Sequence, residues 1–213
     1  MNISFFKSAM SKNHALIDSD EFFENIRLGR WKHEIDALRG CLMNDGKDAY
    51  NKKKKLLFAV TLSGNFNGRT ELVEYSGLMQ GDIDNVENPE LLRDELSLDP
   101  HVRASFLSPS GQGVKLAIKV PQDPDLHTEY FHTARKYFRD THGVELDTSC
   151  KDINRLMFVS CDADIKGNED AVALEVPCSS PSNTLLAPEI YGCLLYTSPS
   201  PRDAHESRMP SSA

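Results

Sequence analysis

The stretch Leu78-Met79-Gln80-Gly81-Asp82-Ile83-Asp84 begins with apolar residues and ends in two aspartates separated by one residue. Alternate side chains of a β-strand share a face, so a strand here turns Asp82 and Asp84 to one side and Ile83 into the core. Two like charges so close together repel each other unless a cation lies between them. Mg²⁺ and Mn²⁺ prefer carboxylate oxygens, so this stretch predicts a metal-binding strand. A solvated turn is the alternative.

The composition is that of a globular chain with one core. The chain has 213 residues, of which 39% are hydrophobic and 26% charged, enough for one domain with a real core or for a domain plus a small extension. Its net charge of −8 argues against binding nucleic acid through general electrostatics. Any contact with phosphates must therefore come from a local basic patch or from a metal ion.

The sequence pattern does not predict a targeting signal. No apolar run approaches membrane-spanning length, and the N-terminus is a poor signal peptide. The five cysteines are scattered, odd in number and without a Cys-x-x-Cys pair, which argues against a zinc site and against a disulfide framework. A reducing cytoplasm is the expected compartment.

In the first third of the chain, a helix is expected to begin at Ser19 as its N-cap and to run to about Leu38, with a packing role for its apolar stripe. The polar stretch 44–51 indicates a loop. The lysines 52–55 precede an apolar strand at 56–62, and a solvated strand edge is favoured over contact with a phosphate backbone. Residues 63–69 have the composition of a turn.

Further along, the sequence predicts helices and strands from capping signals and apolar periodicity. Asn88 and Pro89 begin a helix, and Gly143 ends one that starts near Asp125. His127 and His132 lie on that second helix with a spacing that is poor for metal ligands. The expected strands are 102–107, 114–120, 144–147 and one from about Arg155, and the later pair Asp162 and Asp164 is interpreted as loop polarity.

The stretch Ser108-Pro109-Ser110-Gly111-Gln112-Gly113 leads into an alternating strand that contains Lys115. Such a turn can direct backbone N–H groups at an anion, but from this segment alone an ordinary hairpin turn is favoured, less so if Lys115 lies on a strand next to the aspartates. Lys115 and Arg155 both follow the apolar alternation of their strands. They are expected to project onto the surface that carries the aspartates.

Three segments together resemble the archaeo-eukaryotic primase superfamily, and within it the VirE N-terminal-like domains. These segments are the Asp-x-Asp strand, the Ser-x-Ser-Gly-x-Gly turn, and Leu146-Asp147 followed eight residues later by Arg-Leu-x-Phe. The resemblance covers roughly residues 56–164. It also includes Val60-Thr61-Leu62-Ser63-Gly64-Asn65-Phe66 and Tyr75-Ser76-Gly77-Leu78.

The resemblance implies roles for individual residues. Asp82, Asp84 and Asp147 match the catalytic, metal-binding aspartates, which would hold Mg²⁺ or Mn²⁺. The residues that match nucleotide-contacting positions are Ser108, Ser110, Gly111, Lys115 and Arg155. Many catalytic primases have His where this chain has Lys115, a departure that bears on catalysis but leaves phosphate contact in place.

The resulting expectation is an α+β, primase-polymerase-like fold with helices packed on a mainly antiparallel sheet. Its domains would be an N-terminal helical region at 1–55 and a catalytic core at 56–192. The Ser- and Pro-rich residues 193–213 resemble translated adapter sequence, which implies a longer natural protein.

The expected function is metal-dependent nucleotidyl transfer in the replication of a mobile element or phage. Its partners would be nucleoside triphosphates, a single-stranded DNA template and a helicase module beyond the C-terminal end. The alternative is a non-catalytic module of the same fold that binds DNA or nucleotides. Convergence of the three aspartates at metal-bridging distance would favour catalysis.

Overall fold

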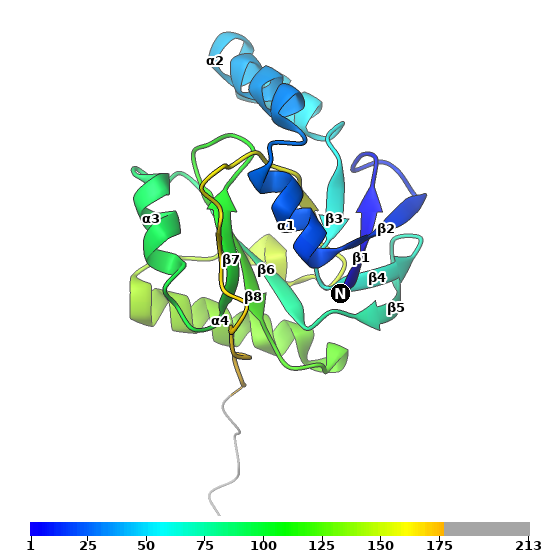
Figure 1. Cartoon of the computed structure of the whole chain (residues 1–213), viewed down its shortest axis with the longest axis vertical. Helices are drawn as coiled ribbons and strands as arrows, with labels where there is room; N and C mark the ends of the chain where they lie inside the picture. Colours follow the sequence, from blue (N-terminus) through cyan, green and yellow to red (C-terminus); the bar gives the residue numbers. More distant parts are fainter. Residues whose placement is uncertain (177–213) are drawn as a thin grey trace, which may run out of the picture. The chain divides into compact units, whose positions relative to one another are not determined.

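The computed structural model describes residues 1–176, so the predicted tail and the end of the predicted core lie outside the described residues. The fold is α+β, with helices packed on antiparallel sheets (Figure 1). In chain order the elements are β1 (Asn2–Phe6), β2 (His14–Asp18), α1 (Ser19–Arg27), α2 (Lys32–Lys54), β3 (Ala59–Thr61), β4 (Gly64–Asn67), β5 (Glu71–Tyr75), β6 (Leu78–Ile83), α3 (Pro89–Leu96), β7 (Val102–Leu107), β8 (Val114–Lys119), η1 (Pro124–Leu126), α4 (His127–His142), η2 (Thr148–Lys151), β9 (Leu156–Phe158) and β10 (Lys166–Gly167).

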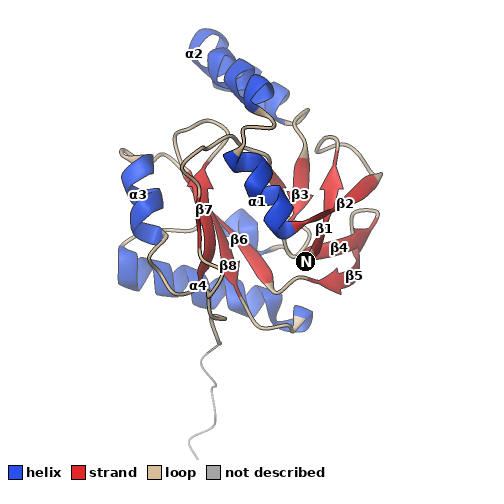
Figure 2. Ribbon diagram, viewed as in Figure 1, coloured by secondary structure: helices blue, strands red, loops and turns tan. Residues whose placement is uncertain are grey.

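The sheet with the strand order β10-β7-β8-β6 carries the predicted Asp-x-Asp strand (Figure 2). That strand is β6, which pairs along its whole length with β8, from Leu78 opposite Lys119 to Ile83 opposite Val114. Asp84 lies one residue beyond the end of the strand. Helix α1 covers one face of this sheet and α4 the other (Figure 1). The sheet therefore lies between two layers of helices.

Strand β8 separates two hydrophobic cores. Leu116 and Ile118 pack with Phe131 of α4 in one core, whereas Ala117 packs in the other core, to which α1 and α2 contribute. The alternation in the sequence is real, but the face expected to be polar is buried as well. Lys115 lies on the same face as Ala117, so its charged group needs a partner inside the protein.

A second sheet has the order β2-β1-β3-β9 and is antiparallel throughout, and β4 and β5 form a separate pair. Residues 1–55, predicted as a helical region, thus also contribute two strands that the sequence did not reveal. Strand β1 is held by long-range pairing, with Phe6 opposite Ala59 of β3. A strand of five residues that depends on a partner so far away in sequence has little local signature.

The helix predicted from Ser19 to Leu38 is wrong in its extent, because the chain breaks it into α1 and α2. Asp18, not Ser19, is the N-cap: its carboxylate accepts from the Asp20 N–H at 2.9 Å. Gly29 follows the first helix with a φ of +68°, a conformation that glycine adopts without strain. The packing role of the apolar stripe is confirmed, since its members Phe22, Ile26, Trp31, Ile35 and Leu38 are buried.

The stretch 44–51, predicted to be a loop, lies within α2 and is helical apart from a break at Gly46. The polar composition, which indicated a loop, is that of an exposed helix surface: most of these side chains are exposed, while Tyr50 is buried. The lysines 52–54 form the last turn of this helix, where cations interact favourably with the helix dipole. Their interpretation as a strand edge is therefore wrong.

Three shorter predictions also change. Of the strand expected at 56–62, only Ala59–Thr61 pairs with neighbours, and the turn expected at 63–69 contains strand β4. The short strand expected at 144–147 is not formed; instead, Asp147 caps the 3₁₀ turn η2. Each of these segments is too short for periodicity to decide between strand and turn.

The helices and strands that the sequence predicted from clear start and stop signals are confirmed. Pro89 lies in the first turn of α3, and Gly143 ends α4 in the left-handed conformation with a φ of +69°. Strands β7, β8 and β9 lie at or within one or two residues of their predicted positions. Within residues 1–176, no helix has the combined length and apolarity that a membrane crossing requires.

Asp162 is more than loop polarity, which corrects its interpretation from the sequence. Its Oδ1 lies 2.8 Å from Nη1 of Arg93, and its Oδ2 accepts from the Leu107 N–H at 2.9 Å. Both charged side chains are about 95% buried. Asp164, the second residue of the pair, is exposed. The two aspartates of this motif therefore have different roles.

Candidate functional site

Asp82 and Lys115 form the centre of the candidate site. They lie directly opposite each other on β6 and β8, and opposite residues of antiparallel strands share a face. The Lys115 ammonium lies 2.6 Å from Oδ2 of Asp82. Lys115 is only 4% exposed, so it is a buried ion-pair partner and not the exposed lysine expected from the sequence.

The second carboxylate oxygen of Asp82, Oδ1, is buried and has no hydrogen-bond partner within the described residues. Asp84 follows it at the end of the strand. Burial raises the pKa of the Asp84 carboxyl and the charge of Asp82 raises it further, while Lys115 acts in the opposite direction. The environment of Asp84 thus disfavours a second negative charge unless a cation compensates it.

Asp147 lies next to these two aspartates through the backbone. Its N–H donates to the carbonyl oxygen of Asp82 at 2.9 Å. Its side chain, however, is occupied: one oxygen accepts from the Ser149 N–H at 3.0 Å and the other from the Ser149 hydroxyl at 2.5 Å. Burial works to raise the pKa of Asp147, but these hydrogen bonds outweigh it and lower the pKa. Asp147 is therefore a capping residue in this conformation.

The three predicted ligands thus assemble only in part. Among residues 1–176, no three side chains of the types His, Cys, Asp and Glu are placed so that they could hold one metal ion. Asp82 and Asp84 line one pocket together, whereas Asp147 does not line it. The site as it stands is a pair of carboxylates with a lysine bound to one of them.

The pocket that contains Asp82 and Asp84 has a volume of about 180 Å³, and we call it the carboxylate pocket. One wall comes from α2, a segment that the sequence did not place near the site. The residues that α2 contributes are Leu42, Lys47, Tyr50, Asn51 and Lys54. The run of lysines at 52–55 was the one sequence feature that pointed to this wall. The position of the wall over the aspartates depends on how α2 packs.

The turn 108–113 connects β7 to β8 as an ordinary hairpin. The Gly111 N–H donates to the Ser108 carbonyl at 2.9 Å, and the Gln112 N–H lies 3.2 Å from the Ser110 hydroxyl. These N–H groups are therefore engaged within the turn and do not point at an anion. Ser108 and Ser110 still line the carboxylate pocket, whereas Gly111 faces Arg39 of α2.

Arg155 is exposed and lies in a different place from the one expected. It lines a separate and larger pocket of about 660 Å³, which the strand β9 borders. Its charge still contributes to lowering the pKa of Asp147. Lys54 lines both pockets, so Arg155 adjoins the carboxylate pocket without being part of it.

Comparison with known proteins changes the family assignment. The family model described as BT4734-like, N-terminal domain matches residues 51–166, which is more than half of the chain. The resemblance to VirE N-terminal-like domains and to the primase superfamily is therefore wrong, because the matching family is a different one. No curated protein and no solved structure matches the chain.

Proposed function

Since the chain belongs to the family of BT4734-like N-terminal domains, a name that states no activity, we propose its function from the carboxylate pocket: metal-dependent nucleotidyl transfer with nucleoside triphosphates. The observation that supports this most is the buried, unpartnered Oδ1 of Asp82 beside the raised pKa of Asp84. A buried carboxylate oxygen without a partner is costly, and a cation bound there offsets that cost.

The donor set fits a hard divalent ion. Carboxylate oxygens suit Mg²⁺ and Mn²⁺, and Asp82 and Asp84 are the residues that would hold the ion. Asp147 would contribute only if its side chain released Ser149. A bound ion supplies neutralisation of the charge that develops on phosphate oxygens.

The chain itself supplies the remaining groups that phosphoryl chemistry requires, which are mainly positive charges and positioning. Lys54 and Lys115 both line the pocket, and their ammonium groups can neutralise phosphate oxygens. The hydroxyls of Ser108 and Ser110, 3.0 Å apart, are placed to orient a phosphate. Tyr50, buried in the wall from α2, forms part of the pocket lining.

Binding of Mn²⁺ tests the metal site directly. We expect Mn²⁺ at a hundred times its dissociation constant to raise the free energy of unfolding by about 2.7 kcal/mol, measured by urea denaturation. Asp84→Asn should remove this stabilisation because a ligand loses its charge. The control pair Asp45→Asn with Asp48→Asn removes exposed charges from α2 and should leave the stabilisation intact. A parent protein that does not respond to Mn²⁺ would refute the metal site.

The pH dependence of Mn²⁺ binding provides a further check. Protons and metal compete for the carboxylates, so binding should weaken as the pH falls. Because the pKa of Asp84 is raised, this weakening should begin at a higher pH than for an ordinary aspartate. Titrations of Mn²⁺ at several pH values should show it. If Mn²⁺ binding weakens only at the low pH at which an ordinary aspartate is protonated, Asp84 does not have the proposed role.

A binding module without catalysis is the second candidate, and the ion pair between Lys115 and Asp82 favours it. An oxygen of Asp82 that is bound to lysine is less available to a metal ion. Under this candidate, Lys115→Ala weakens nucleotide binding, whereas Lys119→Ala, on the same strand but outside the pocket, does not. A nucleotidyl-transfer assay of the parent with Mg²⁺ or Mn²⁺ separates the two: binding without transfer selects the module.

The compartment that we propose is the cytoplasm. Support comes from Cys41, Cys150 and Cys161, the cysteines of the described part, which are free thiols. Burial raises the pKa of the Cys150 thiol to about 11, which keeps it protonated and unreactive. Free thiols of this kind are typical of a reducing environment.

A further inference from the structure

The pocket that contains Arg155 is a feature that the proposed function does not use. It has a volume of about 660 Å³, and we call it the basic pocket. The end of α2, the β4–β5 turn and the segment before β9 each contribute positive charge to it. Its cationic side chains are Lys54, Lys55, Arg69 and Arg155.

None of these four cations forms an ion pair with an acidic side chain of residues 1–176, and Asp152 is the acidic residue in the lining. The helix dipole explains the two lysines at the end of α2. It does not explain Arg69 and Arg155, which come from other elements. Four cations from three segments, with Asp152 among the residues that line the same pocket, form a local basic patch on a chain with a net charge of −8.

Arg69 is held in place as a ligand-binding arginine would be. Its guanidinium lies 4.9 Å from the centre of the Phe6 ring, and Nη1 donates to the Ala9 carbonyl at 2.9 Å. Its Nε is buried and has no hydrogen-bond partner within the described residues. A guanidinium fixed by these contacts places a positive charge in the pocket lining, which is suited to a phosphate group.

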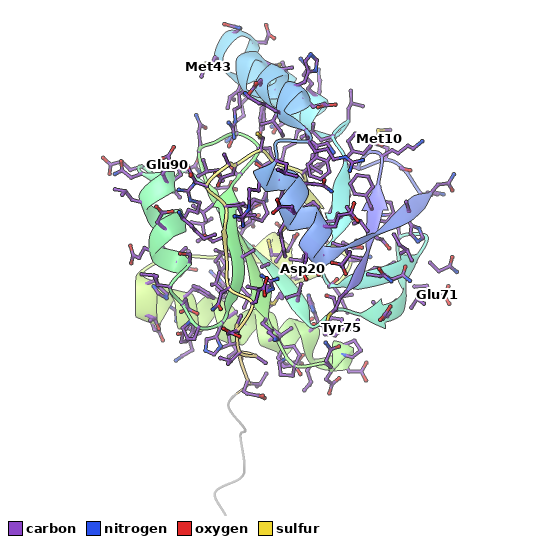
Figure 3. The ribbon with its side chains drawn as sticks, viewed as in Figure 1. Met10, Asp20, Met43, Glu71, Tyr75 and Glu90 are labelled. Carbon is purple, nitrogen blue, oxygen red and sulfur yellow. The ribbon has the colours of Figure 1, made fainter. Side chains whose placement is uncertain are left out.

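Apolar side chains line the same pocket. Met10, labelled in Figure 3 on the loop between β1 and β2, is 77% exposed, and Leu156 and Phe158 come from β9. The Lys54 ammonium lies 5.4 Å from the centre of the Phe158 ring. Cations beside exposed apolar surface form the combination that binds a phosphate together with an unstacked base.

The basic pocket adjoins the carboxylate pocket. Asn51 and Lys54 line both pockets. Burial lowers the pKa of Lys54, and the charges of Lys115 on one side and Arg155 on the other affect it as well. A chain that passes through the basic pocket would therefore reach the carboxylates.

We propose that the basic pocket binds the phosphodiester backbone of a single-stranded nucleic acid, with one base against its apolar side chains. Because the chain as a whole is acidic, contact with phosphates without a metal ion requires a local basic patch. The basic pocket provides such a patch. A recess of this size and apolar lining admits an unstacked base, which a duplex does not offer. This binding needs neither metal nor carboxylates and so extends beyond the proposed function.

Fluorescence anisotropy of a labelled oligothymidylate, measured in EDTA, tests the proposal independently of the metal site. We expect Lys55→Gln with Arg155→Gln, both exposed residues, to weaken binding by about tenfold or more. The slope of log K against log salt should fall in magnitude by about 1.4, since each contact in a single strand contributes about 0.7. Thermal melting should show that the variant is folded.

The control is Lys52→Gln with Lys53→Gln, which also removes two positive charges, both from the run of lysines that contains Lys55 but outside the basic pocket. It should retain the parent's affinity and salt slope. Equal losses in both variants, or no binding by the parent, would overturn the proposal. Displacement of the oligonucleotide by a nucleoside triphosphate at equal phosphate concentration would also overturn it, because the pocket would then be a site for free nucleotides.

Discussion

His127, at the start of α4, is a buried histidine that the fold keeps neutral. It is 4% exposed, and its Nδ1 lies 2.7 Å from the hydroxyl of Tyr75, which Figure 3 labels at the end of β5. Burial lowers the pKa of His127 to about 4, and Asp152 opposes this only weakly. Charging this imidazole therefore favours the unfolded chain.

The first prediction concerns pH. The pKa of His127 is lower in the folded than in the unfolded protein, so its stabilisation is present above pH 6.5 and is lost as the pH falls towards 4. We expect a loss of about 3 kcal/mol from this group, measured by urea denaturation across that window. His127→Gln, which retains a hydrogen-bonding side chain, should flatten the profile. His132→Gln, an exposed position on the same helix, should reproduce the profile of the parent; if it flattens equally, His127 is not the cause.

At the scale of elements, helix α2 is interrupted where it approaches the carboxylate pocket. Gly46 has a φ of +81°, outside the helical region, and it separates the first half of α2 from the half that bears Tyr50 and Lys54. The first half packs in the core through Ile35 and Leu38. Tyr50 of the second half packs in the same core, so the break redirects the helix between two parts that are both held by that core.

The second prediction compares two glycines of α2. A Cβ on either Gly40 or Gly46 meets no atom within 4 Å, so space does not distinguish them. Gly46→Ala should destabilise the protein by about 1–3 kcal/mol because alanine is strained at this φ. Gly40→Ala, in regular helix, should stabilise it by about 0.5–1 kcal/mol. Urea denaturation measures both, and a stabilising Gly46→Ala would mean that α2 is continuous in solution.

At the scale of the whole molecule, a buried ion pair joins segments that are distant in sequence. Arg93 of α3 binds Asp162, which follows β9, and Asp162 also accepts from the backbone of β7. Arg93 has a second partner in the half-exposed Asp94 at 2.8 Å. The loss of Asp162 would leave a guanidinium buried with part of its hydrogen-bonding capacity unused, and the energetic cost falls on the folded state.

The third prediction uses the two aspartates of this motif as a matched pair. Asp162→Ala should destabilise the protein by about 3 kcal/mol, because it removes one partner of a buried pair. Asp164→Ala, two residues away and exposed, should change the free energy of unfolding by less than about 0.5 kcal/mol. Chemical denaturation of both variants measures these changes in the free energy of unfolding. Equal effects would show that Asp162 does not carry the interaction.

Much of the fold was accessible from local signals. Pro89 and Gly143 placed the boundaries of α3 and α4, and apolar runs placed β6, β7 and β8. Strands β1 and β2 and the break between α1 and α2 were missed. The strands depend on partners far along the chain, and the break depends on one glycine in a sequence with an otherwise continuous apolar stripe.

The candidate site, like the fold, could be predicted from the sequence only in part. The register of β6 against β8 placed Asp82 opposite Lys115, two residues that the sequence had singled out separately. Their ion pair could not be foreseen, because it depends on that register and on the burial of Lys115. Lys47 and Tyr50 were missed because their segment reads as a polar loop until it packs as a helix.

By itself, the sequence determined the α+β class, the strand that carries Asp82, and the acidic net charge of the chain, since each follows from periodicity or from composition. The tertiary structure alone decided which charges meet. It bound Lys115 to Asp82, engaged Asp147 with Ser149, and moved Arg155 into a pocket with Arg69. The physical reason is range: local periodicity acts over a few residues, whereas these contacts depend on which distant segments share the same buried volume.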